Sequence, residues 1–167
     1  MAQCKSEAEV LAFLSPKLEI IMKSVAEGLD EWNKKEIDRN VYSKGSPEEY
    51  PRSMEFRDAW KNSTEGGSGE ATAKLEYDPE QMSMQGYVTS FGDVNFTHSS
   101  VVDGSDVRDA LADIIYNSGA GPVFGSGFWT SPRNAWAALI NVINQGAKMR
   151  TWINRGAKNA GLKISWS

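Results

Sequence analysis

The last 54 residues of the chain, from position 114 onward, contain no aspartate and no glutamate. All 22 acidic residues lie at or before Asp113, where 12 lysines and arginines leave a net charge of −10. The residues after Asp113 carry six basic side chains and a net charge of +6. A chain polarised in this way can turn its basic end toward DNA, or dock that end on the acidic part of a neighbour.

Cysteine and histidine are also scarce, since Cys4 and His98 are the only ones. A single cysteine excludes an internal disulfide framework, and the two residues together are too few for a His/Cys zinc site. The common His- and Cys-based catalytic triads lack their residues as well. Asp106, Asp109 and Asp113 share one helix face, but no calcium-loop spacing accompanies them, which favours solvated charge. We therefore expect no enzymatic activity, no cofactor and no metal.

Long apolar runs are missing too. None approaches the ~20 residues that a membrane-spanning helix needs, and the first residues lack the basic and apolar regions of a signal peptide. At 167 residues the chain has the length of one domain, which we expect to span 1–167. We expect a protein without a membrane partner that is assembled in the cytoplasm.

Helix signals begin near the N-terminus. Ser6 with Glu9 forms a capping box, and Ser15-Pro16 has the form of a second helix start. Apolar residues then recur every three or four positions from Leu18 to Trp32, which predicts a long helix that reaches about residue 39. Further helices are predicted from Ser105, and from Ser131-Pro132 through Gly146 to Trp152 or beyond.

Strand signals occupy the middle of the chain. Alternation in residues 71–77 predicts a strand, residues 84–96 predict one or two more, and Leu162 to Trp166 predicts a short last one. The polar, glycine-rich stretch 62–69 predicts a flexible loop. The expected fold is α+β, with a long N-terminal helix, a small antiparallel sheet of about three to five strands, and a long C-terminal helix packed on that sheet.

Residues 119–129 interleave four glycines with Phe124, Phe128 and Trp129. The stretch lacks the Lys-Ser/Thr ending of a P-loop and the G-x-G-x-x-G order of a dinucleotide site. A connector that carries an apolar plug, a contact between subunits and, less favoured, a ligand loop remain open for it.

The basic C-terminal third has one cluster that suits a nucleic acid. Lys148, Arg150 and Arg155 lie close together with Trp152 between them, a pattern typical of phosphate contact combined with stacking. Six charges over this length are sparse, and no sequence-reading motif is present. We expect at most non-specific DNA contact from these residues.

Two segments together resemble the neck proteins of tailed phages, a family of tail-completion, head–tail joining and minor capsid proteins. The first is the Tyr/Arg segment with Tyr42, Tyr50-Pro-Arg52, Phe56 and Trp60, and the second runs from Gly125 through Arg133 to Trp136. Pro51 and Ser53 differ from the family's usual residues around Arg52, and the region 81–103 is longer than in the family. The latter difference leaves the number of strands open.

The resemblance implies a structural virion protein, a head–tail joining domain in a ring between the capsid portal complex and the tail tube. The ring would be a cyclic homo-oligomer, a hexamer by analogy with tail symmetry. Its other partners would be adjacent neck, portal-adaptor and tail-tube proteins, and genome DNA would pass through it.

The resemblance also implies roles for particular residues. Arg52 would contact a carboxylate, while Tyr42, Tyr50 and Trp60 would pack the turn that presents it. For Tyr42 and Trp60 a purely internal role is favoured. Candidate contacts with the next subunit or ring are Phe124, Phe128, Trp129 and Arg133. The alternative function is a small DNA-associated protein that uses Lys148, Arg150 and Arg155 on its basic C-terminal helix.

Overall fold

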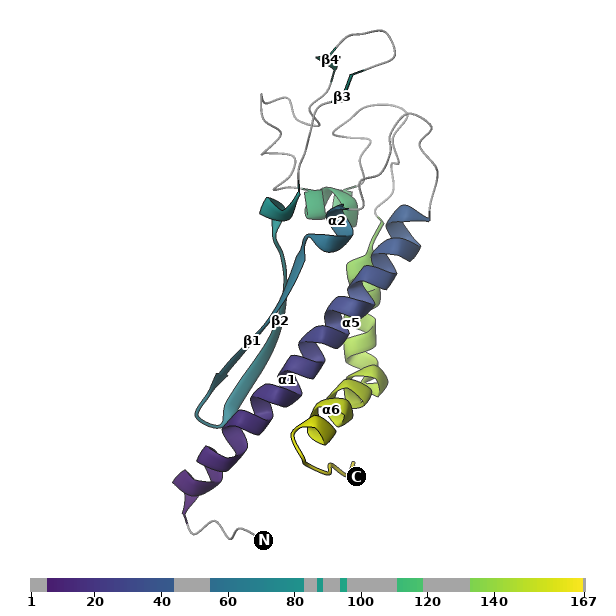
Figure 1. Ribbon diagram of the computed structural model, residues 1–167. Coiled ribbons are helices and arrows are strands. Elements are labelled where there is room, and N and C mark those ends of the chain that lie inside the picture. Colours follow the sequence, from purple (N-terminus) through teal and green to yellow (C-terminus); the bar gives the residue numbers. More distant parts are fainter. Residues whose placement is uncertain are drawn as a thin grey trace. The chain divides into compact units, whose positions relative to one another are not determined.

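The structure, a computed structural model, describes residues 6–43, 55–82, 87–88, 94–95, 111–118 and 133–166. It is α+β, as predicted, with a long N-terminal helix, an antiparallel pair of long strands and C-terminal helices (Figure 1). The chain divides into two compact units. Unit 1 comprises residues 1–33, 61–76 and 138–167, and unit 2 comprises residues 34–60 and 77–137.

Helix α1 (Glu7–Ile37) begins at the predicted cap, where the Glu9 backbone N–H donates to Ser6 Oγ at 3.3 Å. The second helix start predicted at Ser15-Pro16 is wrong, because α1 runs through the proline. The Ser15 hydroxyl instead donates to the Leu11 carbonyl at 2.8 Å, a bond made inside a helix.

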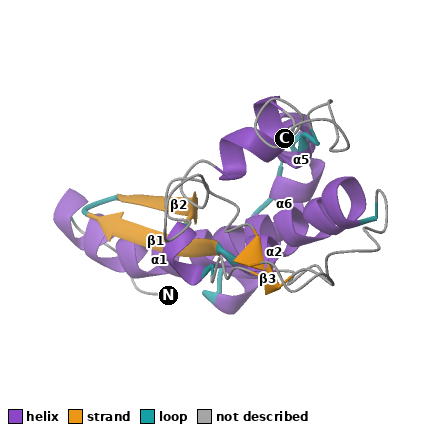
Figure 2. Ribbon diagram, turned by 90° about the horizontal axis from the view of Figure 1, so that it is seen from above, coloured by secondary structure: helices purple, strands orange, loops and turns teal. Residues whose placement is uncertain are grey.

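Strands β1 (Trp60–Gly67) and β2 (Glu70–Tyr77) form a long hairpin beside α1 (Figure 2). β2 confirms the strand predicted from the alternation in residues 71–77. The loop predicted at residues 62–69 is wrong, because most of this stretch is β1 and a two-residue turn remains. Its small polar residues are poor strand formers by composition, but the pairing with β2 overrides that preference.

The sheet has fewer strands than predicted. Within the described residues β1 and β2 pair only with each other, and β3 (Tyr87–Val88) and β4 (Val94–Asn95) form a separate antiparallel pair. These two short strands lie within residues 84–96, where one or two were predicted, and among the described residues they pair with each other and not with the hairpin.

The predicted long C-terminal helix is two helices, α5 (Ala135–Gln145) and α6 (Ala147–Asn159). Gly146 separates them with a φ of 73°, a left-handed conformation that interrupts a helix and that glycine adopts without steric cost. The Oδ1 atom of Asn134 accepts from the Ala137 N–H at 2.6 Å and caps α5. The start predicted at Ser131-Pro132 lies outside the described residues.

α6 ends in a Schellman motif. The Gly161 N–H donates to the Lys158 carbonyl at 3.1 Å, and the Leu162 N–H donates to the Ala157 carbonyl at 2.8 Å. Residues 162–166 have no regular structure, so the short strand predicted there is not formed.

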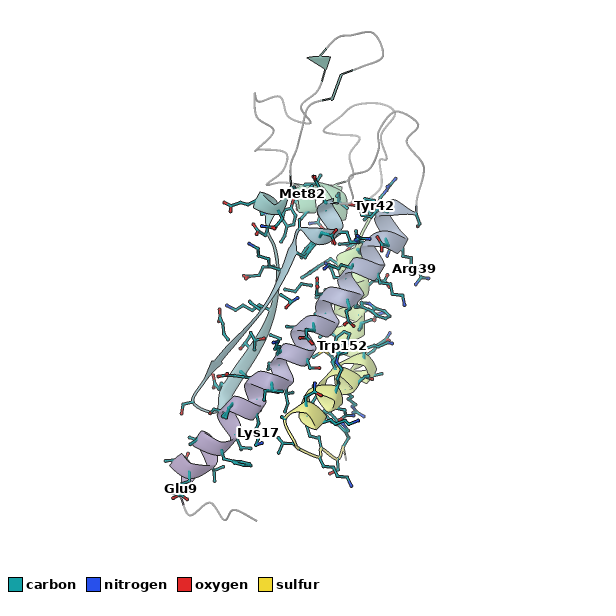
Figure 3. The ribbon with its side chains drawn as sticks, viewed as in Figure 1. Glu9, Lys17, Arg39, Tyr42, Met82 and Trp152 are labelled. Atoms are coloured by element: carbon teal, nitrogen blue, oxygen red, sulfur yellow. The ribbon has the colours of Figure 1, made fainter. Side chains whose placement is uncertain are left out.

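α6 packs on α1, whereas Trp136 of α5 stacks on Trp60, the first residue of β1. A Cβ atom added to Gly156 would lie 2.6 Å from Ile21 Cα, and one added to Gly28 would lie 2.5 Å from the Trp152 ring. Trp152 is 6% exposed and lies between the two helices (Figure 3). The missing side chains at the two glycines allow this close approach, since the separation of packed helices depends on the residues at the contact.

The remaining described elements are short and belong to unit 2. They are the π-helix η1 (Asp38–Tyr42), the one-turn helix α2 (Glu55–Asp58), the 3-10 helix η2 (Pro79–Gln81) and the π-helix η3 (Ile114–Ser118). Among the described helices, none has both the length and the apolarity required to cross a lipid bilayer.

Candidate functional site

The core of unit 2 is a cluster of aromatic rings centred on Trp60. The Trp60 ring stacks on Trp136 and on Tyr116, with centroid distances of 5.5 and 5.9 Å. Tyr77 lies 5.5 Å away, and Phe56 meets Trp60 edge to face at 6.1 Å. Such geometries add stabilisation beyond the area that the rings bury. This cluster gives Trp60 the internal role that was favoured for it.

Two polar atoms inside the cluster have no hydrogen-bond partner among the described residues. They are Nε1 of Trp60 and the hydroxyl of Tyr116. Burial raises the pKa of the Tyr116 hydroxyl, and the nearby Tyr42 and Tyr77 act in the same direction. The neutral phenol is therefore strongly favoured in the folded protein.

Tyr42 and Arg133, two of the predicted interface residues, come close together in unit 2. The Arg133 guanidinium donates to the Val41 carbonyl at 2.8 Å, and its backbone N–H donates to the Ile115 carbonyl at 2.7 Å. Tyr42 is half-buried, and burial raises the pKa of its hydroxyl. Arg133 thus joins η1, η3 and the start of α5, which is a positioning role inside the unit.

An arginine that the sequence reasoning missed lies beside Tyr42. Arg57 forms ion pairs with Asp58 at 3.2 Å and with Asp38 at 3.7 Å, and the carboxylates raise its pKa. Burial raises the pKa of Tyr42, and a hydrogen bond with the Arg57 backbone offsets part of that rise. In the sequence, the acidic neighbour Asp58 marks Arg57 as a residue able to form an ion pair. The resemblance of this segment to the neck proteins favours Arg52 for such a contact instead.

Five of the predicted interface residues lie outside the described residues: Tyr50, Arg52, Phe124, Phe128 and Trp129.

The three predicted DNA-facing cations each contact other residues of unit 1. The Lys148 ammonium lies 5.1 Å from the centre of the Trp32 ring, and the Arg150 guanidinium lies 5.2 Å from that of Trp166. Arg155 donates to Ser24 Oγ at 2.8 Å and to the Ser24 carbonyl at 3.0 Å. These cations therefore serve the packing of α6 and the tail, whatever further contacts they make.

Unit 1 also has a hollow between α1 and β1. It measures about 320 Å³ and is open to solvent. The side chains that line it are mixed, with apolar, acidic and basic members: Pro16, Glu19, Ile20, Lys23, Thr64 and Gly66. Ile20 is 42% exposed, which is high for a large aliphatic side chain that lines a concave surface.

The charges of unit 1 are separated by segment. Residues 6–33 and 61–76, which form most of α1 and the hairpin, carry nine acidic and four basic side chains and a net charge of −5. Residues 138–166, which form most of α5, α6 and the tail, carry five basic side chains and no acidic one. Each part has exposed large apolar side chains: Val10, Phe13 and Ile20 on the acidic part, and Ile140, Ile164 and Trp166 on the basic part.

A comparison of the chain with models of protein families, with curated proteins and with solved structures found no match in any of the three.

Proposed function

We propose that the chain is a structural subunit of a tailed-phage virion, part of the neck or tail-completion ring that joins the tail to the capsid portal complex. The subunits form a cyclic homo-oligomer, a hexamer, which contacts adjacent neck, portal-adaptor and tail-tube proteins. Genome DNA passes through the ring and makes non-specific contacts with it.

The observation that carries this proposal is the separation of charge by segment within unit 1. Residues 6–33 and 61–76 have a net charge of −5, and residues 138–166 have five basic side chains and no acidic one. A ring requires heterologous interfaces, in which one surface of a subunit meets a different surface of the next. Opposite charge on the two surfaces favours this head-to-tail contact over a contact of like with like.

The resemblance of the Tyr/Arg segment and of the residues around Arg133 then directs the proposal to the phage neck. Arg133 and Tyr42 come from the two resembling segments, and in unit 2 Arg133 binds the residue that precedes Tyr42. Contact between segments that are 92 residues apart supports the view that they act together.

The proposal is tested by the mass of the purified protein in solution, measured by light scattering, and by negative-stain imaging. We expect a mass of several 18.4 kDa subunits and an annulus with a pore wide enough for duplex DNA. The assembly should dissociate as salt rises, because charge complementarity between exposed surfaces is screened. A persistent monomer that binds DNA tightly would contradict the proposal.

One observation favours a second function, a small DNA-associated protein: residues 138–166 carry five basic side chains and no carboxylate. This function requires a monomer whose DNA affinity falls steeply with salt. Replacing Lys148 and Arg150 together by glutamine should then lower the salt slope by about one for each phosphate that is no longer bound. The matched control replaces Lys34 and Lys35 of α1 by glutamine.

A further inference from the structure

The C-terminal tail, residues 162–166, has the features of a strand without a partner. Leu162, Ile164 and Trp166 are apolar and alternate with Lys163 and Ser165. Leu162 packs against the buried residues Ile21, Ala157 and Ala160, whereas Ile164 and Trp166 are exposed. Beyond Leu162, no backbone hydrogen bond of the tail is made to any described residue. The tail thus has a strand pattern, and beyond Leu162 its backbone has no backbone partner among the described residues.

The side chain of Trp166 nevertheless holds the tail in place. Its Nε1 donates to Asn154 Oδ1 at 2.9 Å, and Arg150 lies over its ring. Asn154 and Arg150 are exposed residues of α6, so the tail follows the solvent side of that helix. Both contacts of Trp166 are made by exposed residues, and seating Trp166 on another molecule would replace them.

The edge of β1 is a suitable acceptor for such a segment. Within the described residues β1 pairs with β2 on one side and with no strand on the other. Its residues from Asn62 to Gly67 are exposed except for Thr64, which with Gly66 lines the hollow beside Ile20 of α1. A strand added to this edge would place alternate side chains over the hollow, since side chains of a strand alternate between its two faces.

The geometry of unit 1 directs the tail to a different molecule. The hairpin contacts α1 at Leu11 and Glu19, whereas α6 contacts it at Ile21 and Gly28. With 3.6 residues per turn, the centres of these two sets lie about 130° apart around the helix. Figure 1 shows the hairpin and α6 on the two sides of α1 accordingly. In the structure Trp166 contacts Asn154 and Arg150 of its own α6, and none of the residues that line the hollow belongs to the tail.

We propose that the tail of one copy adds as a strand to the β1 edge of a second copy, with Ile164 and Trp166 seated in the hollow beside Ile20. Lys163 lies on the opposite face of the added strand, near the acidic side chains of the hairpin. The basic residues of α6 and the tail, 147–166, of one copy thereby meet the acidic segments 6–33 and 61–76 of the next. Main-chain hydrogen bonds give such an added strand its affinity, and the pockets for alternate side chains give it specificity.

This contact rests on the proposed function, because it supplies the heterologous interface that a ring requires. A strand of five residues makes a weak contact between two free molecules. Closure of a ring makes the last contact intramolecular, so several weak contacts become a stable assembly.

The experiment compares three full-length proteins with a truncation after Leu162, which keeps the residue that packs against the core. Ile20→Arg places a cation in the hollow where the basic tail would bind. Ile140→Arg makes the same change at an isoleucine with nearly equal exposure, 41% against 42%, away from the hollow. All variants are first checked for native unfolding transitions, and Lys163→Glu is a further tail variant should the truncation fail to fold.

We expect the wild type and Ile140→Arg to assemble, and the truncation and Ile20→Arg to be monomers when measured alone. A mixture of the two monomeric variants is the decisive sample, because one keeps the hollow and the other keeps the tail. Because a single contact of this kind is weak, the mixture is measured at the highest attainable protein concentration, where it should associate 1:1 and grow no further. Assembly of the truncated protein to the wild-type mass overturns the proposal while leaving the ring intact, and so does a mixture that stays monomeric.

A labelled peptide of residues 161–167 tests the same contact if the wild type is itself a monomer. The peptide should bind the truncated protein saturably, at least about tenfold more weakly after Ile20→Arg, and unchanged after Ile140→Arg. Binding by the peptide with a monomeric wild type supports the tail contact and counts against a ring that forms without partners. Absence of saturable binding overturns the tail contact.

Discussion

The cores of the two units are packed by residues of different size. In unit 1 the contact between α1 and α6 depends on small residues, since Gly156 and Gly28 leave no room for a side chain. Two side chains hydrogen-bond across this contact: Arg155 donates to Ser24, and the Lys17 ammonium donates to the Ala160 carbonyl at the end of α6. In unit 2 the core consists of large rings.

Both units also bury polar atoms that lack a hydrogen-bond partner among the described residues, and in unit 1 these include Nδ2 and Oδ1 of the Asn33 amide. The cluster of unit 2 buries the indole nitrogen of Trp60 and the hydroxyl of Tyr116 without partners among the described residues. Buried polar groups without partners reduce stability, so the rings must contribute enough to exceed that cost. We therefore expect larger side chains at the helix contact to destabilise unit 1, and truncation of the buried rings to destabilise unit 2.

The largest effect is expected from Trp60→Ala in unit 2. Trp60 is 8% exposed and contacts four other rings, so its truncation leaves a large cavity at the centre of the cluster. The free energy of unfolding should fall by about 3–5 kcal/mol, the range for buried aromatic residues. Urea unfolding followed by circular dichroism measures the change.

The control for this change is Trp166→Ala, because Trp166 is 44% exposed. Its loss should lower the free energy of unfolding by about 1 kcal/mol or less, as for most surface positions. Equal costs at the two tryptophans would show that the cluster does not determine the stability of unit 2.

A smaller loss of stability, caused by added volume and not by a cavity, is expected from Gly156→Ala in unit 1. The added methyl group would meet the backbone of Ile21 at 2.6 Å, and a backbone cannot rotate away as a side chain can. The gain in helix propensity is smaller than the cost of separating α6 from α1, so we expect a net loss of about 1–3 kcal/mol. Urea unfolding is again the measurement.

Gly67→Ala is the matched change, since a Cβ atom there meets nothing within 4 Å. It should leave the free energy of unfolding unchanged or slightly raised. If Gly156→Ala is tolerated as well as Gly67→Ala, the close approach of the helices does not limit the stability of unit 1.

These two regions also show what could be predicted from the sequence. The apolar spacing from Leu18 to Trp32 predicted α1, and the alternation in residues 71–77 predicted β2, because both patterns are local. The strand at 62–67 was missed because its pairing with β2, and not its composition, makes it a strand. The sequence predicts one helix through Gly146 where the structure has two. A glycine in a helical pattern does not show from the sequence whether its backbone is helical or left-handed.

The contacts between distant segments could not be predicted in the same way. Gly28 and Gly156 are glycines within amphipathic helices, which is a sign of close packing. The sequence near each glycine does not show which residue of the other helix it contacts. The convergence of Trp60, Tyr116 and Trp136 likewise depends on the tertiary fold. Arg133 was selected from the sequence, but its bond to the Val41 carbonyl required residues 92 positions apart to meet.

The smallest effect concerns the buried hydroxyl of unit 2. Tyr116→Phe removes a group without a described partner and keeps the ring, so the free energy of unfolding at pH 7 should rise by up to about 1 kcal/mol. Tyr77→Phe is the control, because the Tyr77 hydroxyl contacts Met82 Sδ at 3.1 Å and its removal loses a bond. The Tyr77 variant should therefore be no more stable than the wild type.

The effect of Tyr116→Phe should also depend on pH. Burial raises the pKa of Tyr116 above its ordinary value of about 10, so the folded state retains a proton that the unfolded state has released. As pH rises above about 10, ionisation in the unfolded chain draws the equilibrium toward unfolding, and the wild type loses stability. Tyr42, whose pKa is also raised, titrates in both proteins, so the difference between them isolates Tyr116. The advantage of the phenylalanine variant should grow between pH 9 and pH 11 in urea unfolding, and a constant difference would mean that the Tyr116 hydroxyl is accessible to water.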